Sequence, residues 1–428
     1  MHTIKRYVAR YKRQIFVGQS FKLVEAILEL LLPLVMAQLI DQGIRQADRG
    51  VIFSRGMLMF AIVAVGMGTA LVCQVVASRA SQDFGTELRR DLFAHMQTLS
   101  HADVDQFGTP SMITRLITDV NQLQYALAML IRLVIRSPFL AVGSIFMALL
   151  LDWKLSLIFL FTTPLIALLL YWVMKKSVPF FRMLQKNLDR IARIARENLE
   201  GIRVVRAFSR QKHETARFEQ TTQTYADTAV RVGRLSAFLN PATTVIMNAG
   251  ILAILWIGGQ QVDQGFLSQG ILIAFINYII QIALQTAIVA NLVVIFTKAS
   301  ASMHRVEEVF DRKPSVADSA QSLPECPANA PALEMRGVSF AYPTGGANAL
   351  ENLDFRVERG ETLGIIGGTG SGKSTLAGLV ARFYDVQSGT VRVFGAPVAS
   401  YPLAALRAMI GFVPQQAVLV SGTVRKNL

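Results

Sequence analysis

Six long apolar stretches constrain this chain more than any other feature of its sequence. A helix needs about 20 mostly apolar residues to cross a bilayer. Only 17% of the residues are charged and 52% are hydrophobic, whereas about a quarter of an ordinary soluble chain is charged. The sequence therefore predicts six membrane-spanning helices. They are Leu23–Ile40, Gly56–Ala77, Leu133–Leu151, Leu155–Met174, Ala242–Ile257 and Ile271–Phe296.

The distribution of Lys and Arg predicts the orientation. Basic residues are concentrated in the tail up to Lys22 and in the two long connections, residues 79–132 and 175–240, while the other connections carry few. Basic connections stay on the cytoplasmic side. We therefore expect a multi-pass protein of the plasma or inner membrane, with the N-terminus, both long connections and the C-terminal region cytoplasmic. The net charge of +14 is then a topology signal, and no nucleic-acid partner is expected.

The second long connection is predicted to be helical. In Leu184–Phe208, apolar residues recur mostly at spacings of three and four, with basic residues between them. Such helices would extend the spans well beyond the bilayer. Residues 311–332, rich in Pro, Ser and Ala, have no periodicity and are predicted to be a linker.

After the linker the pattern changes to that of strands. Leu333–Tyr342 and Leu353–Val357 have strand-like patterning, and Thr362–Ile366 is predicted to be a short buried strand. It leads into a glycine-rich segment, and Thr375–Phe383 is predicted to be the helix that follows.

The glycine-rich segment matches the phosphate-binding loop pattern G-x-x-x-x-G-K-[ST]. Its glycines allow successive backbone N–H groups to point at phosphate oxygens, and the following helix presents its N-terminus to the anion. Lys373 is expected to reach the β- and γ-phosphates, and the Ser374 hydroxyl to ligate Mg²⁺. The sequence thus predicts ATP and Mg²⁺ as ligands. The predicted nucleotide-binding residues here are Gly367, Gly368, Thr369, Gly370, Ser371, Gly372, Lys373, Ser374 and Thr375.

Further motifs give the chain a resemblance to ATP-binding cassette (ABC) exporters of the bacterial multidrug type, over essentially its whole length. The membrane half carries FGTPSMITRLITDV at residues 107–120 and EGIRVVRAF at residues 200–208. Ala299–Phe310 looks like the family's exit from the membrane domain, Tyr342 matches the aromatic that stacks on adenine, and Gly411–Gln415 matches the Q-loop.

The resemblance implies an α-helical membrane domain (residues 1–310, six transmembrane helices), the linker 311–332, and an incomplete α/β nucleotide-binding domain of the phosphate-loop type (333–428). It also implies pairing with a second exporter subunit, as homodimer or heterodimer, and alternating access driven by ATP. Gln415 would contact Mg²⁺ and the attacking water. Coupling helices that sit on the ATP domains are expected near Thr109–Thr118 and Val204–His213.

Polar residues within the spans predict a substrate path for a small amphipathic, perhaps cationic compound. Intramembrane ionisable groups usually face a cavity or a partner. Glu25 and Glu29 share one face of the first span, and Asn277, Gln281 and Gln285 share one face of the sixth. The alternative is structural: interhelical hydrogen bonds for the amides, and interfacial placement of the glutamates near Lys22.

The sequence departs from the family pattern after Gln415. Leu428 follows thirteen positions later, and the family's signature motif, Walker B strand and switch His are not found. This chain alone is therefore not expected to hydrolyse ATP, although a full-length protein would. Two interpretations stay open: a fragment of an ATP-hydrolysing exporter subunit, or a short non-hydrolytic membrane protein, such as a decoy subunit or the product of a decayed gene. Thr362–Ile366 is expected to expose unpaired backbone in a domain ending here.

Overall fold

The computed structural model describes residues 2–318, 323–327, 329–342, 347–415 and 419–427. Six of its helices are long and apolar enough to cross a membrane, which confirms the predicted number. The first runs through α2 (Lys12–Gln38) into a π-helical turn, and the third is built from several segments that end in α7 (Arg136–Leu151). The others are α3 (Arg49–Thr98), α8 (Trp153–Glu200), α10 (Gln211–Asp263) and α11 (Gln269–Asp311).

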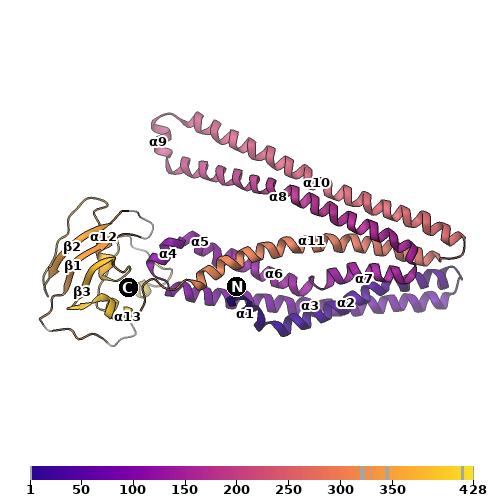
Figure 1. Cartoon of the computed structure of the whole chain (residues 1–428), viewed down its shortest axis with the longest axis horizontal. Coiled ribbons are helices and arrows are strands. Elements are labelled where there is room, and N and C mark those ends of the chain that lie inside the picture. Colours follow the sequence, from indigo (N-terminus) through magenta and orange to yellow (C-terminus); the bar gives the residue numbers. More distant parts are fainter. Residues whose placement is uncertain (1, 319–322, 328, 343–346, 416–418, 428) are drawn as a thin grey trace. The chain divides into compact units, whose positions relative to one another are not determined.

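Several of these helices continue far beyond a bilayer. Helix α8 has 48 residues and α10 has 53, so each is more than twice the length needed to cross about 30 Å of hydrocarbon. Figure 1 shows them running side by side, with the short helix α9 (Ile202–Ala207) joining their ends. The prediction of a helical second connection is confirmed, and the helix is continuous with the span that precedes it.

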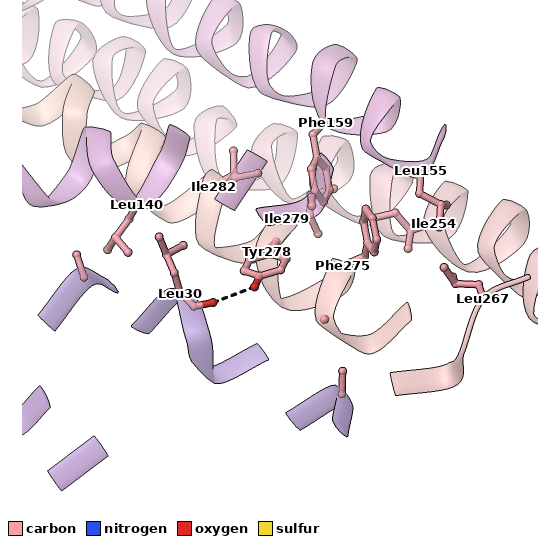
Figure 2. Packing of buried hydrophobic residues seen from close by; sticks show 14 residues of the cluster. Leu30, Leu140, Leu155, Phe159, Ile254, Leu267, Phe275, Tyr278, Ile279 and Ile282 are labelled. Atoms are coloured by element: carbon pink, nitrogen blue, oxygen red, sulfur yellow. Dashed lines mark hydrogen bonds between the residues drawn. The ribbon is translucent and has the colours of Figure 1, made fainter. Parts of the chain in front are cut away.

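The core of the membrane half is an apolar cluster shared by α2, α7, α8, α10 and α11. The rings of Phe159 and Phe275 lie 5.6 Å apart. The fully buried Tyr278 donates its hydroxyl hydrogen to the backbone oxygen of Leu30 at 2.9 Å (Figure 2). Because a buried hydroxyl needs a hydrogen-bond partner, this contact ties α11 to α2 specifically.

The C-terminal region contains a small antiparallel sheet, with strand order β2–β1–β3–β4. Strands β1 (Leu333–Phe340) and β2 (Leu350–Val357) confirm two predicted strands. The sequence analysis did not predict β3 (Ser388–Val393) or β4 (Ala396–Pro397). Apolar residues of the sheet pack against α12 (Lys373–Val380) and α13 (Leu403–Ala408). We call residues 333–427 the sheet domain.

The prediction of a strand at Thr362–Ile366 is wrong. These residues form no strand and join none of the ladders of the described sheet. The side chain of Ile366 is fully exposed, and Leu363 and Ile365 are about half exposed. A short apolar run can form a buried strand only where strands lie beside it, and here the antiparallel sheet completes its pairing without this segment. Residues 362–366 are exposed, as expected.

The chain divides into two compact units. One comprises Met1–Lys5, Gly85–Gln122 and Ala301–Leu428, and the other comprises Arg6–Phe84 and Leu123–Ser300. Residues 85–122 of the first long connection and the end of α11 therefore share a unit with the sheet domain. The domain boundaries at residues 310 and 332 stay a prediction. Residues 312–318, 323–327 and 329–332 form no helix or strand.

Candidate nucleotide and coupling site

The phosphate-loop segment has the backbone that its glycines allow. Gly370 and Gly372 both have φ of +85°, a region in which a side chain is strained. Gly372 precedes α12, and a Cβ there would lie 2.6 Å from the Leu350 side chain and 2.9 Å from the Ala349 backbone oxygen. A Cβ on Gly367 would lie 2.5 Å from the Ser371 hydroxyl oxygen. Glycine is therefore favoured at Gly370 by its φ alone, and at Gly372 by both its φ and the close backbone.

Lys373 and Ser374 lie where an anion and a metal ion could reach them. The Lys373 ammonium donates to the backbone oxygens of Gly367 and Gly368, both at 2.7 Å, and to the Ser371 hydroxyl at 3.2 Å. Its charge is thus held over the loop. Ser374, in the first turn of α12, is exposed. A cationic loop leading into a helix N-terminus fits a phosphate group, and the accessible hydroxyl fits a Mg²⁺ ligand.

Tyr342 contacts the helix that follows this loop. The Tyr342 and Thr375 hydroxyl oxygens are hydrogen-bonded at 2.9 Å. The Tyr342 ring also packs edge-on against Phe340 and Tyr384, at 5.0 and 5.3 Å between centroids. Gln415 is exposed and makes no hydrogen bond to any other described residue.

A short helix of the first long connection, α4 (His101–Phe107), packs on the sheet domain. The His101 ring stacks on Phe383 at 4.4 Å between centroids and an angle of 23°. The Tyr384 hydroxyl donates to the Asp105 carboxylate at 2.6 Å. Burial, and next the Arg407 charge, lower the pKa of His101, although Asp105 opposes this. A neutral imidazole is thereby favoured in the contact.

This contact corrects the predicted position of the first coupling helix. Residues 109–118 form α5 (Thr109–Thr114) and most of a π-helical turn (Arg115–Asp119), whereas the segment that packs on the sheet domain is α4, just before them. The sequence does signal the start of α4: Ser100 and Asp103 form a capping box. Its packing partners could not be read from that motif.

Aromatic contacts continue from α4 to the predicted Q-loop. Phe412 packs edge-on against Phe383 at 5.3 Å between centroids, and Phe383 in turn stacks on His101. The Arg407 guanidinium lies 5.6 Å from the Phe383 ring centre. Phe383 therefore contacts both the Q-loop segment and α4. None of these partners of α4 was predicted.

Asp103 joins α4 to the residues that follow α11. Its fully buried carboxylate accepts hydrogen bonds from the Ser100 hydroxyl at 2.6 Å, Arg312 Nε at 2.8 Å and the Ser315 N–H at 2.9 Å. Burial alone would raise the pKa of Asp103, but these hydrogen bonds outweigh it and lower the pKa to about 2. A buried carboxylate with this many donors holds the three segments firmly together.

A second buried carboxylate, Asp119, makes a parallel link. It accepts from Ser302 at 2.9 Å and from Arg305 Nε at 2.8 Å, both in α11. Arg115 donates to the Arg305 backbone oxygen at 2.9 Å and pairs with Glu308 at 2.8 Å. Residues 101–119 are therefore fixed both to the sheet domain and to the end of the last long helix.

Comparison with known proteins agrees with this arrangement. Residues 15–286 match the ABC transporter transmembrane region, and residues 350–427 match the ABC transporter ATP-binding family. The chain belongs to the ABC transporters. It is 32% identical over 427 residues to an uncharacterized ABC transporter ATP-binding protein of Mycobacterium tuberculosis, covering 99% of this chain and 73% of that relative. The ABC transporter domain at residues 350–427 implies ATP binding.

Two further relatives have functional names. An ATP-dependent lipid A-core flippase of Chromobacterium violaceum is 26% identical over 422 residues, covering 99% of this chain and 72% of the flippase. A multidrug efflux ATP-binding/permease protein of Mycobacterium tuberculosis is 29% identical over 422 residues, covering 99% of this chain and 35% of that protein. Both align with nearly the whole of this ABC transporter chain.

In the membrane half of this ABC transporter, the two predicted carboxylates are ion-paired. Arg136 of α7 pairs with Glu29 at 2.6 Å and approaches Glu25 to 3.6 Å, and Lys22 pairs with Glu25 at 2.6 Å. These contacts connect α2 with α7 and favour the structural alternative for the two glutamates.

The predicted amide stripe on α11 runs from an exposed to a buried position. The Asn277 amide donates to the backbone oxygen of Ile273, and Gln281 Oε1 accepts from Ser144 at 3.0 Å. Gln285 is 4% exposed, and its Oε1 accepts no hydrogen bond from the described residues. Gln281 thus makes the interhelical bond of the structural alternative, whereas Gln285 keeps an unused acceptor.

The second predicted coupling helix is α9 (Ile202–Ala207), which begins two positions before the predicted segment. None of its residues is buried. Three apolar side chains at this end of the α8–α10 pair are largely exposed, with Leu199 at 75%, Val204 at 61% and Phe208 at 73%. Helix α9 is thus exposed, whereas α4 packs on the sheet domain.

Proposed function

We propose that this chain is one subunit of an ATP-driven exporter that moves amphipathic or lipophilic, drug-like compounds out across the membrane by alternating access. The observation that carries the proposal is the placement of α4. This helix contacts the sheet domain through His101 and Asp105, and the residues that directly follow α11 through Asp103. A movement of the sheet domain on binding nucleotide would be passed through it to a membrane helix.

At the nucleotide site, the chain's own residues have separate roles in this proposal. Lys373 and the loop N–H groups hold the phosphates, and Tyr342 stacks on the adenine. Ser374 and Gln415 hold Mg²⁺, which supplies charge neutralisation at the phosphates when bound. A movement of Gln415 on binding nucleotide would shift the nearby Phe412, which touches Phe383. Such a movement would therefore act on α4 through the contact of Phe383 with His101.

The proposed exporter contains two subunits, each crossing the plasma or inner membrane with its N-terminus and sheet domain in the cytoplasm. The exposed apolar end at α9 supports the pairing, because contiguous exposed apolar surface marks an interaction site. The basic connections support the orientation.

The proposed substrate class rests on the membrane half and on the relatives. Those relatives carry the names lipid A-core flippase and multidrug efflux protein, and both kinds of cargo are amphipathic or lipophilic. Gln285 offers a buried acceptor. A cationic substrate would have to displace Arg136 or Lys22 from the two glutamates. If the full-length pump carrying Glu25→Gln and Glu29→Gln exports a lipophilic cationic dye unchanged, a role for these carboxylates in cation binding is wrong.

The test of the proposal has two steps. First, the chain in lipid nanodiscs should bind a fluorescent ATP analogue with Mg²⁺, and Lys373→Ala should weaken binding at least tenfold. Second, inside-out vesicles from cells making the full-length pump should accumulate a lipophilic dye with ATP, and vesicles with the Lys373→Ala pump should not. Binding without any ATP-dependent accumulation would favour the non-hydrolytic alternative, and absence of binding would overturn both.

A further inference from the structure

Exposed basic and aromatic side chains alternate at one level of α8. The Lys175 ammonium lies 5.8 Å from the centre of the Tyr171 ring, and the Lys176 ammonium lies 4.9 Å from the centre of the Trp172 ring. All four side chains are exposed. Aromatic rings with an adjacent cation are typical of the level at which a helix leaves the hydrocarbon and enters the headgroups.

The length of α8 places this level at a membrane boundary. The helix begins with the exposed Trp153. From Trp153 to Trp172, a rise of about 1.5 Å per residue gives about 28 Å, close to the hydrocarbon thickness of about 30 Å. The two tryptophans therefore mark opposite edges of the hydrocarbon, and Lys175 and Lys176 lie in the headgroup layer next to Trp172.

Helix α10 brings more positive charge close to this layer. The Asn187 amide donates to the Thr228 hydroxyl at 3.2 Å, which fixes the antiparallel register of α8 and α10. Arg182 of α8 then lies near the level of Arg231 and Arg234 of α10. All three arginines are exposed.

The cations at this level have no internal counter-charge. Within the described part of the chain, none of the five makes an ion pair or hydrogen bond, and exposed Phe181 and Phe238 lie among them. We call this set the basic belt; its members are Lys175, Lys176, Arg182, Arg231 and Arg234.

We infer that the basic belt binds the headgroups of anionic phospholipids in the leaflet at this end of α8 and α10. Each Lys or Arg near an anionic surface contributes about 1 kcal/mol of attraction, and the aromatic rings fix the two lysines at headgroup depth. A topology signal alone requires neither that the cations lack an internal counter-charge nor that aromatic rings lie beside the two lysines. The inference depends on the proposed membrane position of α8 but not on ATP turnover.

Quenching of Trp172 by brominated lipids tests the inference. The sequence has three Trp residues, so Trp153→Phe and Trp256→Phe leave Trp172 as the reporter. The full chain is placed in vesicles of phosphatidylcholine and phosphatidylglycerol, with one or the other brominated. We expect phosphatidylglycerol to be preferred at Trp172 by about fivefold or more, and the preference to fall towards one in Lys175→Gln/Lys176→Gln. Lys175→Arg/Lys176→Arg should keep it.

The matched control removes positive charge from the same helix outside the headgroup layer. Arg190, Arg193 and Arg196 are exposed and make no ion pair with a described residue, and they begin about 20 Å beyond Lys176 along the helix, more than a Debye length at physiological salt. Arg190→Gln/Arg193→Gln/Arg196→Gln should leave the preference unchanged. Equal quenching by both lipids in the parent, or an equal loss in this control, would overturn the inference. Labelling of exposed Cys326 from one side checks that every variant inserts alike.

Discussion

The two long connections of this ABC transporter each contain a short helix, and the two helices have opposite surroundings. Helix α4 is covered by its own chain: His101 stacks on Phe383, Asp105 accepts from Tyr384, and Asp103 is fully buried. Helix α9 has no buried residue, and Phe208 beside it is 73% exposed. One connection is completed within the subunit, and the other presents apolar surface suited to a second subunit.

The largest effect is expected from Asp103→Asn. The change removes the charge that organises Arg312, Ser315 and Ser100, and charge-assisted hydrogen bonds contribute about 1.5–3 kcal/mol each. We expect a loss of about 2–4 kcal/mol, seen as a clearly lower melting temperature of the full chain in detergent. Glu197→Gln is the control, because Glu197 pairs with Arg217 on the surface and such pairs contribute about 0–1 kcal/mol. Equal shifts in the two variants would contradict the difference between α4 and the α9 hairpin.

Substitution of one phenylalanine beside each helix tests the difference between α4 and α9 directly. Phe383 lies against His101 and Phe412, whereas Phe208 is mostly exposed. Phe383→Ala should cost about 2–3 kcal/mol and speed hydrogen exchange in residues 101–107. Phe208→Ala should change the stability of the isolated chain by less than about 0.5 kcal/mol. A larger cost at Phe208 would show that α9 is already covered within one chain.

The pKa of Asp103 gives a pH-dependent form of the same test. Its pKa is lowered from 3.8 to about 2, so its stabilising effect is present above the ordinary value and is lost as the pH falls towards about 2. The difference in stability between the parent and Asp103→Asn should therefore be constant above about pH 5 and shrink below about pH 4. A difference that does not change down to pH 2 would show that the carboxylate charge is not what binds Arg312.

The smallest expected effect concerns His101. Burial, and then Arg407, lower its pKa below the usual 6.5, so the neutral ring stabilises the contact above that value and the stabilisation is lost as the pH falls below it. The protection factors of the amide hydrogens in α4, which correct for the slower intrinsic exchange at lower pH, should fall from pH 7 to pH 5. His101→Phe keeps an aromatic ring on Phe383 and should remove this dependence. A parent with no such change between pH 7 and pH 5 would argue against the contact.

A structural feature could be predicted from the sequence where residues close together in the chain determine it. Six spans, helical connections and the phosphate loop follow from apolar periodicity or from adjacent glycines, and the structure and comparisons agree with them. The partners of α4 could not be predicted, because Phe383 and Tyr384 lie in another part of the chain. The strand predicted at Thr362–Ile366 was wrong for a related reason. An apolar run indicates that burial is possible, but it does not show that a neighbouring strand is present.

The pairing of the membrane carboxylates was missed in the same way. The proximity of Lys22 to Glu25 was visible in the sequence, since the two are three residues apart. The contact of Arg136 with Glu29 depends on how α2 packs against α7, and no local pattern encodes that packing. The polar stripe on α11 was local, but the burial of Gln285 is set by neighbouring helices.

Hydrogen exchange of α4 and the end of α11, with and without MgATP, tests the central claim most directly. In the parent chain, MgATP should change exchange in residues 101–107 and also in residues 302–311. In Asp103→Asn/Asp119→Asn, which removes both carboxylate links to α11 and to the residues after it, ATP affinity and the response of residues 101–107 should remain, but the response of residues 302–311 should disappear. If residues 302–311 respond equally in the variant, or if the parent binds ATP without any response in α4, then this helix is not the link between the sheet domain and the membrane helices.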